Sequence, residues 1–495
     1  MHTPLLSTLS TAIPLLLLAC TDGTTHRLTD GSDAEPNDDG GSQSGGTGGS
    51  QGSENPGGSG STGGSGTGAS GGSGNPNAQC SSTETECGPT ACCDYQTHVC
   101  NGGDCMPKGQ PCQPGAAPGS KCSDGGTVCR FDGKCVMALS VSAGWMHTCG
   151  VTSAGRAMCW GNNGGDQLGT GGSASPNPVG VTGLDSGVVG IGASLYHSCA
   201  VKASGQVMCW GTNEDGQLGV GTSVAKYATP QFVGGVSTEV VSIAVGGFHT
   251  CAVLMSGTAM CWGDNGSGQL GDSTGNRQRS PVFVVGLPSA VVSISAGNAH
   301  TCAVLQDSSL WCWGSNQYGQ LGTGTTKDSL SPLRPKNLAN NIVSVACGLS
   351  HTCAVDSAGA VKCWGDNVNG QCGRTGGLEF SESGAAVAGL PPVVGTSAGA
   401  DFSCAWTSNG QALCWGANHA GQLGDNGAVL ERHTADLVYG LKSGVRGLSN
   451  TSNKHACAIM ESGKVRCWGY NGDGEIGDGS VGSPHRIPTE LSMFP

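Results

Sequence analysis

The residues of this chain with the greatest chemical potential are its cysteines, which number 27 in 495 residues. So many thiols point either to metal binding or to an oxidising compartment. Fourteen of them form seven pairs in which the two cysteines are ten positions apart and Trp-Gly follows the second. The pairs are Cys149 and Cys159, Cys199 and Cys209, Cys251 and Cys261, Cys302 and Cys312, Cys353 and Cys363, Cys404 and Cys414, and Cys457 and Cys467. Ten more lie within residues 80–135, and the other three are Cys20, Cys347 and Cys372.

Each of the seven pairs is symmetric about a turn, as Cys251 and Cys261 are about Ser256. Residues so placed face each other across an antiparallel hairpin, with Cβ atoms about 4.5–5.5 Å apart. A pair without hydrogen bonds between its backbones can contract to disulfide geometry. We therefore predict seven hairpin disulfides in an oxidising compartment. The alternative is seven pairs of buried free thiols that pack as small hydrophobic groups.

Cys347 and Cys372 stand where other copies of the surrounding repeat hold, respectively, a mostly small residue and Leu or Ile. If the Leu of a copy packs over the small residue of the same copy, the two cysteines keep that contact and make it covalent. We therefore predict a disulfide between Cys347 and Cys372. In the alternative, the Leu packs on the neighbouring copy, and Cα atoms more than about 7 Å apart cannot be bridged without backbone movement.

Other groups that could do chemistry have simpler interpretations. The stretch Gly68–Gly72 matches Gly-x-Ser-x-Gly but lacks the preceding strand and following helix that the nucleophile turn of a hydrolase needs. The segment Asp473-Gly-Glu475 has too few carboxylates for a calcium-binding loop, and we expect it to be a turn. One His recurs per repeat, and at equal radius around a ring these side chains are too far apart to share a metal, so we predict structural hydrogen bonds for them. They are His147, His197, His249, His300, His351 and His455, with Phe402 in the sixth copy. We expect no catalytic residue, no metal, no cofactor and no enzymatic activity.

The elements that must position these residues are short strands. Successive cysteine pairs begin 50 to 53 residues apart, which indicates a repeat architecture. Within one copy Val241, Ile243 and Val245 alternate with small or polar residues, as in a half-buried strand. Four short strands per copy make one propeller blade. We predict an all-β, seven-bladed β-propeller over residues 136–495, in which segments 139–143 and 487–491 complete one blade together.

These copies resemble the RCC1 (regulator of chromosome condensation) repeat family, which is marked by Gly-x-x-His-Thr, Trp-Gly and Asn-x-x-Gly-Gln-Leu-Gly. The last element occurs here as Gly216–Gly219, Gly268–Gly271, Gly319–Gly322 and Gly421–Gly424. The resemblance implies a closed seven-bladed propeller, and the cysteine pairs resemble its secreted bacterial branch. The Trp after each second Cys is expected to pack between blades; these are Trp160, Trp210, Trp262, Trp313, Trp364, Trp415 and Trp468.

The N-terminal part predicts an exported protein. Leu17-Leu18-Ala19-Cys20 ends a short apolar run and resembles a bacterial lipobox. We predict a lipoprotein signal peptide over residues 1–19, a lipid on Cys20, a disordered Gly/Ser-rich linker over 20–79 and a disulfide module over 80–135. The alternatives are an ordinary secretory signal for the first segment and zinc binding for the ten cysteines of the last. The expected location is the outer membrane or cell surface, with the lipid bilayer as a partner.

The charge and the loops bear on function. A formal net charge of −13 opposes a phosphate backbone, so nucleic acid is not an expected partner. We predict a monomeric cell-envelope lipoprotein that acts as a binding scaffold for a protein or glycan through propeller loops of varied length, such as 374–388. One alternative is an inhibitor of a secreted or periplasmic enzyme, for which Tyr196, Phe248, Tyr318 and Tyr470 are candidate exposed aromatics. Another, implied only by the family, is guanine-nucleotide exchange, which an exported chain does not fit.

Overall fold

The computed structural model describes residues 130, 139–236, 239–375, 386–449 and 454–492, together with the backbone of six short strands between residues 84 and 137. The short strands form three hairpins: β1 (Glu84–Gly88) with β2 (Ala91–Asp94), β3 (His98–Asn101) with β4 (Asp104–Pro107), and β5 (Thr127–Cys129) with β6 (Cys135–Met137). The predicted signal peptide, linker and Cys20 lie outside the described residues, and so do the side chains of the ten cysteines of 80–135. The chain divides into two compact units, residues 17–108 and the remainder.

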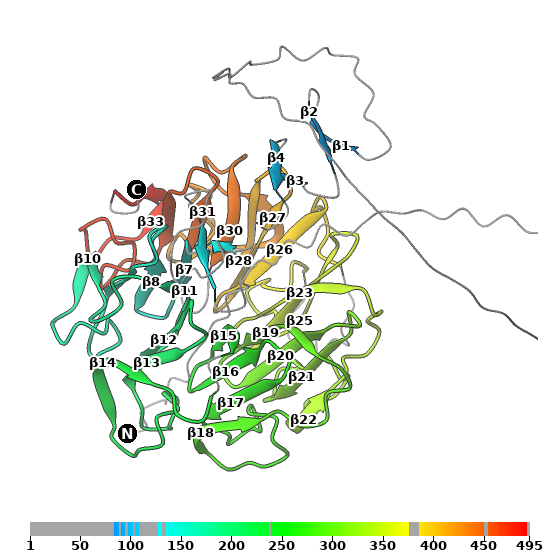
Figure 1. Cartoon of the computed structure of the whole chain (residues 1–495). Coiled ribbons are helices and arrows are strands. Elements are labelled where there is room, and N and C mark those ends of the chain that lie inside the picture. The colour runs from blue at the N-terminus through cyan, green and yellow to red at the C-terminus, as the bar shows by residue number, and fades with distance from the viewer. Residues whose placement is uncertain are drawn as a thin grey trace, which may run out of the picture. The chain divides into compact units, whose positions relative to one another are not determined.

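Seven sheets follow one another along the chain (Figure 1). Blade 1 comprises β7 (Ser140–Ala143), β8 (His147–Val151), β9 (Ala157–Gly161) and β10 (Ser175–Gly180). Blade 2 comprises β11 (Val188–Ala193), β12 (His197–Lys202), β13 (Val207–Thr212) and β14 (Lys226–Phe232). Blade 3 comprises β15 (Val240–Val245), β16 (His249–Leu254), β17 (Ala259–Gly263) and β18 (Gln278–Phe283). Blade 4 comprises β19 (Val291–Ala296), β20 (His300–Leu305), β21 (Leu310–Gly314) and β22 (Ser329–Leu333).

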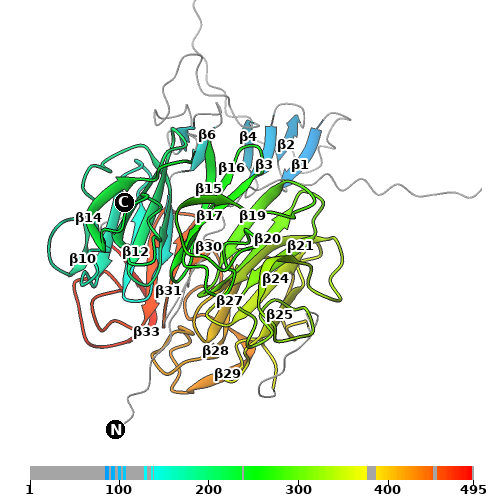
Figure 2. The same ribbon diagram turned by 90° about the horizontal axis from the view of Figure 1, so that it is seen from below.

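The remaining three blades have the same order. Blade 5 comprises β23 (Ile342–Cys347), β24 (His351–Asp356) and β25 (Val361–Gly365), and a single bridge between Lys362 and Ala386 marks its outer edge. Blade 6 comprises β26 (Val393–Ala398), β27 (Phe402–Thr407), β28 (Ala412–Ala417) and β29 (Glu431–Leu437). Blade 7 comprises β30 (Val445–Ser449), β31 (His455–Met460), β32 (Val465–Gly469) and β33 (His485–Glu490). The predicted all-β, seven-bladed propeller is thus confirmed, and every element among the described residues is a strand; Figure 2 shows the same strands from below.

The core of the propeller lies between neighbouring sheets. The first three strands of a blade are almost wholly buried, as in β11 and β12, because other blades cover both of their faces. The fourth strands β14, β18 and β33 contain no buried residue and face outward. The seven tryptophans that follow the second cysteines are completely buried, and they share apolar clusters with residues of the preceding blade. The predicted packing of these tryptophans between blades is confirmed.

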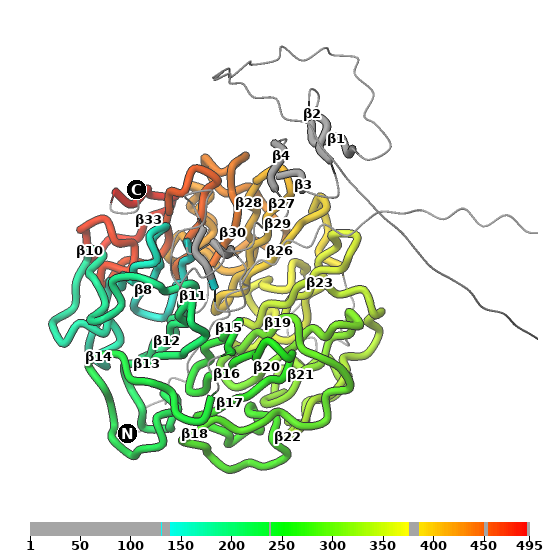
Figure 3. Tube along the Cα trace, viewed as in Figure 1, coloured from blue at the N-terminus to red at the C-terminus, as the bar shows by residue number. Residues whose placement is uncertain are grey.

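The ring closes without exchange of strands between the two ends of the propeller. Blade 1 is built entirely from residues 140–180 and blade 7 entirely from residues 445–490, so the prediction of one shared blade is wrong. Instead the two blades meet through side chains and backbone, with the Ala143 amide donating to the Ser449 hydroxyl. The Gly479 amide likewise donates to the Pro176 carbonyl. Figure 3 shows the red end of the chain beside its first blade. Each copy forms all its own strands, so none has to be completed from the far end of the chain.

The hairpin cysteines pair as predicted. All seven pairs form disulfides, each between directly opposed residues of the second and third strands of a blade, with Cα atoms 4.0–4.1 Å apart. The short loop that each bond closes is the hairpin turn itself. A disulfide of this kind stabilises its own blade rather than the contact between blades.

The predicted disulfide between Cys347 and Cys372 is wrong, because both thiols are free and buried. Cys347 faces blade 4, where its Sγ donates to the Ser295 carbonyl at 3.4 Å. Cys372 shares an apolar cluster with Ala405 and Trp415 of blade 6. The physical reason is that the Leu position of each copy packs on the following blade: Leu321 of blade 4 lies in the same cluster as Cys347 of blade 5. Substitutions at the two positions therefore place sulfur atoms on opposite sides of blade 5.

Candidate interaction face

The repeated histidines join neighbouring blades. In six of the seven junctions the Nε2 atom of the His lies 2.8–3.0 Å from a Ser or Thr hydroxyl of the next blade. That hydroxyl donates in turn to the carbonyl of the Gln or Glu in the Gly-Gln-Leu-Gly element, at 2.8–2.9 Å. The hydrogen bond from His455 to Thr148 closes the ring between blades 7 and 1. The predicted structural role of these histidines is confirmed.

The protonation of these histidines follows from the same contacts. Because each hydroxyl hydrogen is used on the carbonyl, Nε2 must carry the imidazole hydrogen and donate it. The six Nδ1 atoms are then bare acceptors, buried and without a hydrogen-bond partner. Burial lowers the pKa of His300 to about 3 and that of His249 to about 4, so the rings stay neutral in the folded protein.

The junction between blades 6 and 7 replaces both partners of this hydrogen bond at once. Phe402 stands in the place of the His, and Ala456 stands in the place of the Thr. Both side chains are apolar and buried, so the exchange leaves neither a donor nor an acceptor at this contact. A Cβ at Gly399 would lie 2.3 Å from Phe402 Cε1, just as one at Gly297 would lie 2.2 Å from His300 Cε1. The Gly three positions before the ring therefore makes the same room for either ring.

The long loop after each Trp-Gly is held by repeated polar contacts. The indole of each of the seven Trp that follow the second cysteines donates to the carbonyl of the preceding blade's Gln or Glu, as Trp313 does to Gln269 at 2.9 Å. The Asn two positions after each Trp-Gly caps its own loop, as Asn316 does by accepting from the Leu321 amide. In blade 7 Glu475 takes the Gln position, and its carboxylate accepts the Asp473 amide, which confirms the predicted turn. Burial raises the pKa of Glu475 to about 8, so its carboxyl is mostly protonated at neutral pH and resembles the amide it replaces.

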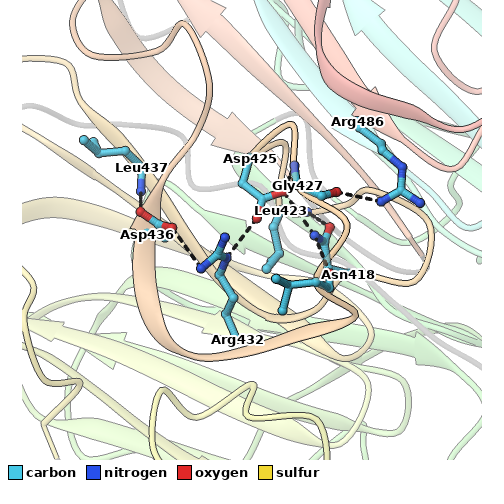
Figure 4. A network of polar contacts seen from close by, with 9 residues as sticks. Asn418, Leu423, Asp425, Gly427, Arg432, Asp436, Leu437 and Arg486 are labelled. Atoms are coloured by element: carbon cyan, nitrogen blue, oxygen red, sulfur yellow. Dashed lines mark hydrogen bonds and ion pairs between the residues drawn. The ribbon is translucent and has the colours of Figure 1, made fainter.

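The corresponding loop of blade 6 carries an additional network (Figure 4). Asp425 accepts from the Asn418 amide and from the Arg432 guanidinium, and Arg432 also pairs with Asp436. Arg486 of blade 7 donates to the Gly427 carbonyl at 2.8 Å. The hydrogen bonds from the Gly427 amide, Arg432 and Asn418 hold the pKa of Asp425 below its usual range even though burial opposes this. The network fixes the loop rather than offering free groups to a ligand.

On this fixed frame, two positions per blade vary in chemistry and share one face. The first is the residue before each repeated His, or before Phe402 in blade 6, and the second is the residue that follows each repeated Trp-Gly. The amide of the second donates to the carbonyl of the first at 2.7–2.9 Å in all seven blades. We call these fourteen residues the turn ring. Its pairs are Met146 and Asn162, Tyr196 and Thr212, Phe248 and Asp264, Ala299 and Ser315, Ser350 and Asp366, Asp401 and Ala417, and Lys454 and Tyr470. All but Ser315 and Ala417 are partly exposed.

The turn ring surrounds an apolar centre. Leu195 and Ala400 are buried there, and Trp145, Tyr196, Phe248 and Leu349 pack against them. These residues come from the turns between the first and second strands of five different blades, so they can meet only near the propeller axis. The face therefore has an aromatic and aliphatic centre.

The charged members of the turn ring are mostly acidic. The turn ring has one cation, Lys454, and three acidic residues, which are Asp264, Asp366 and Asp401. Burial and the neighbouring Asp366 raise the pKa of Asp401, while Lys454 and His419 oppose the rise. Burial also raises the pKa of Asp366. Partly desolvated carboxylates beside aromatic rings form a surface that favours a cationic ligand.

The sequence had indicated only part of this face. Tyr196, Phe248 and Tyr470 belong to the turn ring, whereas Tyr318, which is 39% exposed, lies farther along the loop of blade 4. The aspartates were missed, although their fixed spacing from His and Trp could have singled them out. Within the predicted variable loop 374–388, residues 376–385 lie outside the described residues.

One cluster could in principle ligate a metal among the described residues. Ligand atoms of His300, Cys302 and Cys347 lie within 4.8 Å of one another. Cys302 is already bonded to Cys312, however, so this thiolate is not available in the oxidised protein.

No helix of the described residues is long and apolar enough to cross a membrane.

The fold and the face define a class of protein, a disulfide-bonded repeat propeller whose recurring contacts hold a variable ring on one side. Residues 113–442 match the model of the RCC1-like domain, and residues 450–475 match the regulator of chromosome condensation (RCC1) repeat. The chain belongs to the RCC1-like domain family.

Relatives and solved structures agree with this assignment. The chain is 30% identical over 252 residues to the E3 ubiquitin-protein ligase HERC2 of Homo sapiens, a match that covers 50% of this chain and 5% of that protein. It is 32% identical over 263 residues to the ultraviolet-B receptor UVR8 of Arabidopsis thaliana, covering 52% of this chain and 59% of the receptor. Yeast RCC1 (Prp20), solved bound to Kap60, superposes with a TM-score of 0.60 at 20% identity over 68% of this chain and 83% of that one. The chain thus spans less than two thirds of the curated relatives, and the structural likeness establishes the fold alone.

Proposed function

We propose that the protein is a non-enzymatic binding scaffold of the cell envelope that captures a protein partner on the turn ring. The observation that carries this proposal is the contrast between the two kinds of position in a blade. The residues that hold the blades together recur in the repeat; they are Gly, His, Cys, Trp, Asn and Gln. The turn-ring residues, in contrast, differ from blade to blade and lie on one face. A rigid frame that presents varied, partly exposed side chains is suited to recognition.

The chemistry of the turn ring indicates the kind of partner. Three aspartates around an aromatic centre favour a protein segment in which Lys or Arg alternates with apolar side chains. Solved propellers of this fold support a protein partner in general: yeast RCC1 is bound to Kap60, and Prp20p from Saccharomyces cerevisiae has binding properties to Gsp1p and histones. A glycan is the other ligand that aromatic rings and carboxylates could hold.

Photo-crosslinking from defined positions tests this function. Benzoylphenylalanine is placed at Phe248 or at Tyr470 in the full chain, and an envelope extract supplies the partner. The matched control is Val343, which is 50% exposed at the start of β23, the end of the blade opposite the turn ring. We expect the same protein to crosslink from the two turn-ring positions and not from Val343.

Charge variants complete the test. Asp366→Asn combined with Asp401→Asn should weaken the crosslink several-fold, and added salt should weaken it in the unmodified chain. Equal crosslinking from Val343, or no response to charge and salt, contradicts a turn-ring site. Crosslinking to a carbohydrate instead of a protein would point to a glycan ligand.

The envelope location is a separate part of the proposal. It is supported by Leu17-Leu18-Ala19-Cys20 and by the hairpin disulfides, which persist in oxidising compartments. Mass spectrometry of the mature protein should find a diacylglyceryl group on Cys20. A mature chain that begins elsewhere and carries no lipid would refute the anchor and would leave the binding face untouched. An exported inhibitor of another enzyme would use the same face, and loss of that enzyme's activity on binding would identify it.

A further inference from the structure

The junction between blades 4 and 5 contains a free thiol beside a disulfide. Cys347, at the end of β23, is 1% exposed and occupies a position that is Ala in four other blades. Its Sγ, the Sγ of Cys302 and a ring nitrogen of His300 all lie within 4.8 Å of one another. Cys302 and its partner Cys312 belong to the hairpin of β20 and β21, so the thiol and the disulfide come from different blades.

We propose that Cys347 exchanges with this disulfide and moves the covalent bond from within blade 4 to the junction of blades 4 and 5. The sulfur of Cys347 attacks Sγ of Cys302, a bond forms between them, and the bond from Cys302 to Cys312 breaks. The electron pair of the broken bond goes to the sulfur of Cys312, which takes up the proton that Cys347 released. One disulfide and one thiol are present before and after, so no external oxidant or reductant is needed.

The neighbours of the thiol fit this step. His300 donates through Nε2 to Thr352, so its Nδ1 is a bare acceptor, buried and without a hydrogen-bond partner. Burial lowers the pKa of this ring to about 3, so it stays neutral, and the proton of Cys347 is lost to hydroxide at raised pH rather than to His300. The Cys347 amide is held by the Ser295 hydroxyl at 2.8 Å, which fixes β23 against blade 4. Blade 4, which contains the attacked Cys302, therefore also holds the backbone of Cys347 in place.

The same blade supplies a matched thiol for comparison. Cys372 is also 1% exposed, and burial raises the pKa of both thiols to about 12. Its Sγ donates to the Asp366 carbonyl, and it belongs to no cluster of potential ligand atoms among the described residues. Because the two thiols are equally buried, proximity to the neighbouring disulfide is what distinguishes Cys347.

Acid-quenched peptide mapping tests the exchange. The full chain is incubated at pH 9, where more thiolate forms, then quenched in acid, digested with pepsin without reduction and analysed by mass spectrometry. We expect a peptide in which Cys302 is joined to Cys347, together with a free Cys312, to increase with time. Cys347→Ala should abolish it, and since Ala occupies this position in other blades, the variant should fold. Cys372→Leu, which restores the residue of five other blades, should leave it unchanged.

Two further variants test which sulfur is attacked. When folded with oxidised glutathione, Cys312→Ser should join Cys302 to Cys347, whereas Cys302→Ser should leave Cys312 and Cys347 as thiols. The proposal is overturned if Cys302 remains joined only to Cys312 after prolonged incubation. It is also overturned if Cys347 joins a cysteine other than Cys302, since that would indicate general scrambling.

Discussion

The hydrogen bond between His300 and Thr352 offers a quantitative test of how the blades are joined. At the junction of blades 6 and 7 the same two positions are Phe402 and Ala456, and both partners are replaced together. His300→Phe, Thr352→Ala and the double variant therefore convert one junction into another that the protein already contains. If the contact is a matched pair, the double variant should be more stable than the two single variants predict.

The magnitude follows from what each change leaves unpaired. Thr352→Ala removes the acceptor of the His300 Nε2 hydrogen and leaves a buried donor alone, which costs about 1–3 kcal/mol. His300→Phe removes one bond, but the Thr352 hydroxyl still donates to Gln320 at 2.8 Å, so the cost is about 0.5–1.5 kcal/mol. The double variant leaves no unpaired polar group at this contact, because Trp364 continues to donate to the Gln320 carbonyl. We expect a favourable coupling of about 1–2 kcal/mol.

Urea unfolding of the four oxidised proteins measures this coupling. Costs that add within about 0.5 kcal/mol would refute the reasoning, because independent sites behave in that way. The reverse pair provides a second measurement at the natural apolar junction. Phe402→His alone should destabilise by burying an unpaired donor, and adding Ala456→Thr should recover part of the loss.

Three other outcomes follow from the buried groups. The six histidines bind protons near pH 6.5 in the unfolded chain but not in the folded one, because burial lowers their pKa. Their contribution to the free energy of unfolding should therefore be constant above pH 6.5 and fall as the pH drops toward 3, by about 2 kcal/mol per His at pH 5. His300→Phe with Thr352→Ala should reduce this loss in thermal scans, and an unchanged dependence on pH would contradict it. Glu475 affects stability in the opposite direction, because burial raises its pKa to about 8 in the folded protein. Its contribution to the free energy of unfolding is full below pH 4.5 and is lost as the pH rises to 8. Glu475→Gln should therefore reduce the fall in melting temperature between those two pH values. Thiol titration of denatured, unreduced protein should lose one thiol with Cys347→Ala and one more when Cys372→Leu is added. A gain of one thiol with Cys347→Ala alone would mean that the two residues are bonded to each other.

The sequence by itself determined the parts of this protein that depend on local spacing. Seven cysteine pairs at a fixed separation identified seven hairpins, because residues symmetric about a turn must oppose each other. The repeat period and the alternation in segments such as β15 identified blades of short strands. The role of the histidines could be predicted because a ring of equal radius keeps them apart.

Only the tertiary structure decided which blade a side chain faces. In a tandem repeat, a residue that packs on its own copy and one that packs on the next copy recur with the same period. The sequence therefore could not tell that Cys347 faces blade 4 while Cys372 faces blade 6. The same ambiguity hid the closure of the ring, because the end segments could complete one shared blade or two separate ones. The hydrogen bonds between blades join residues such as Ser198 and Gln167, which are 31 positions apart, and His455 and Thr148, which are 307 positions apart at opposite ends of the propeller. Folding alone brings such residues together.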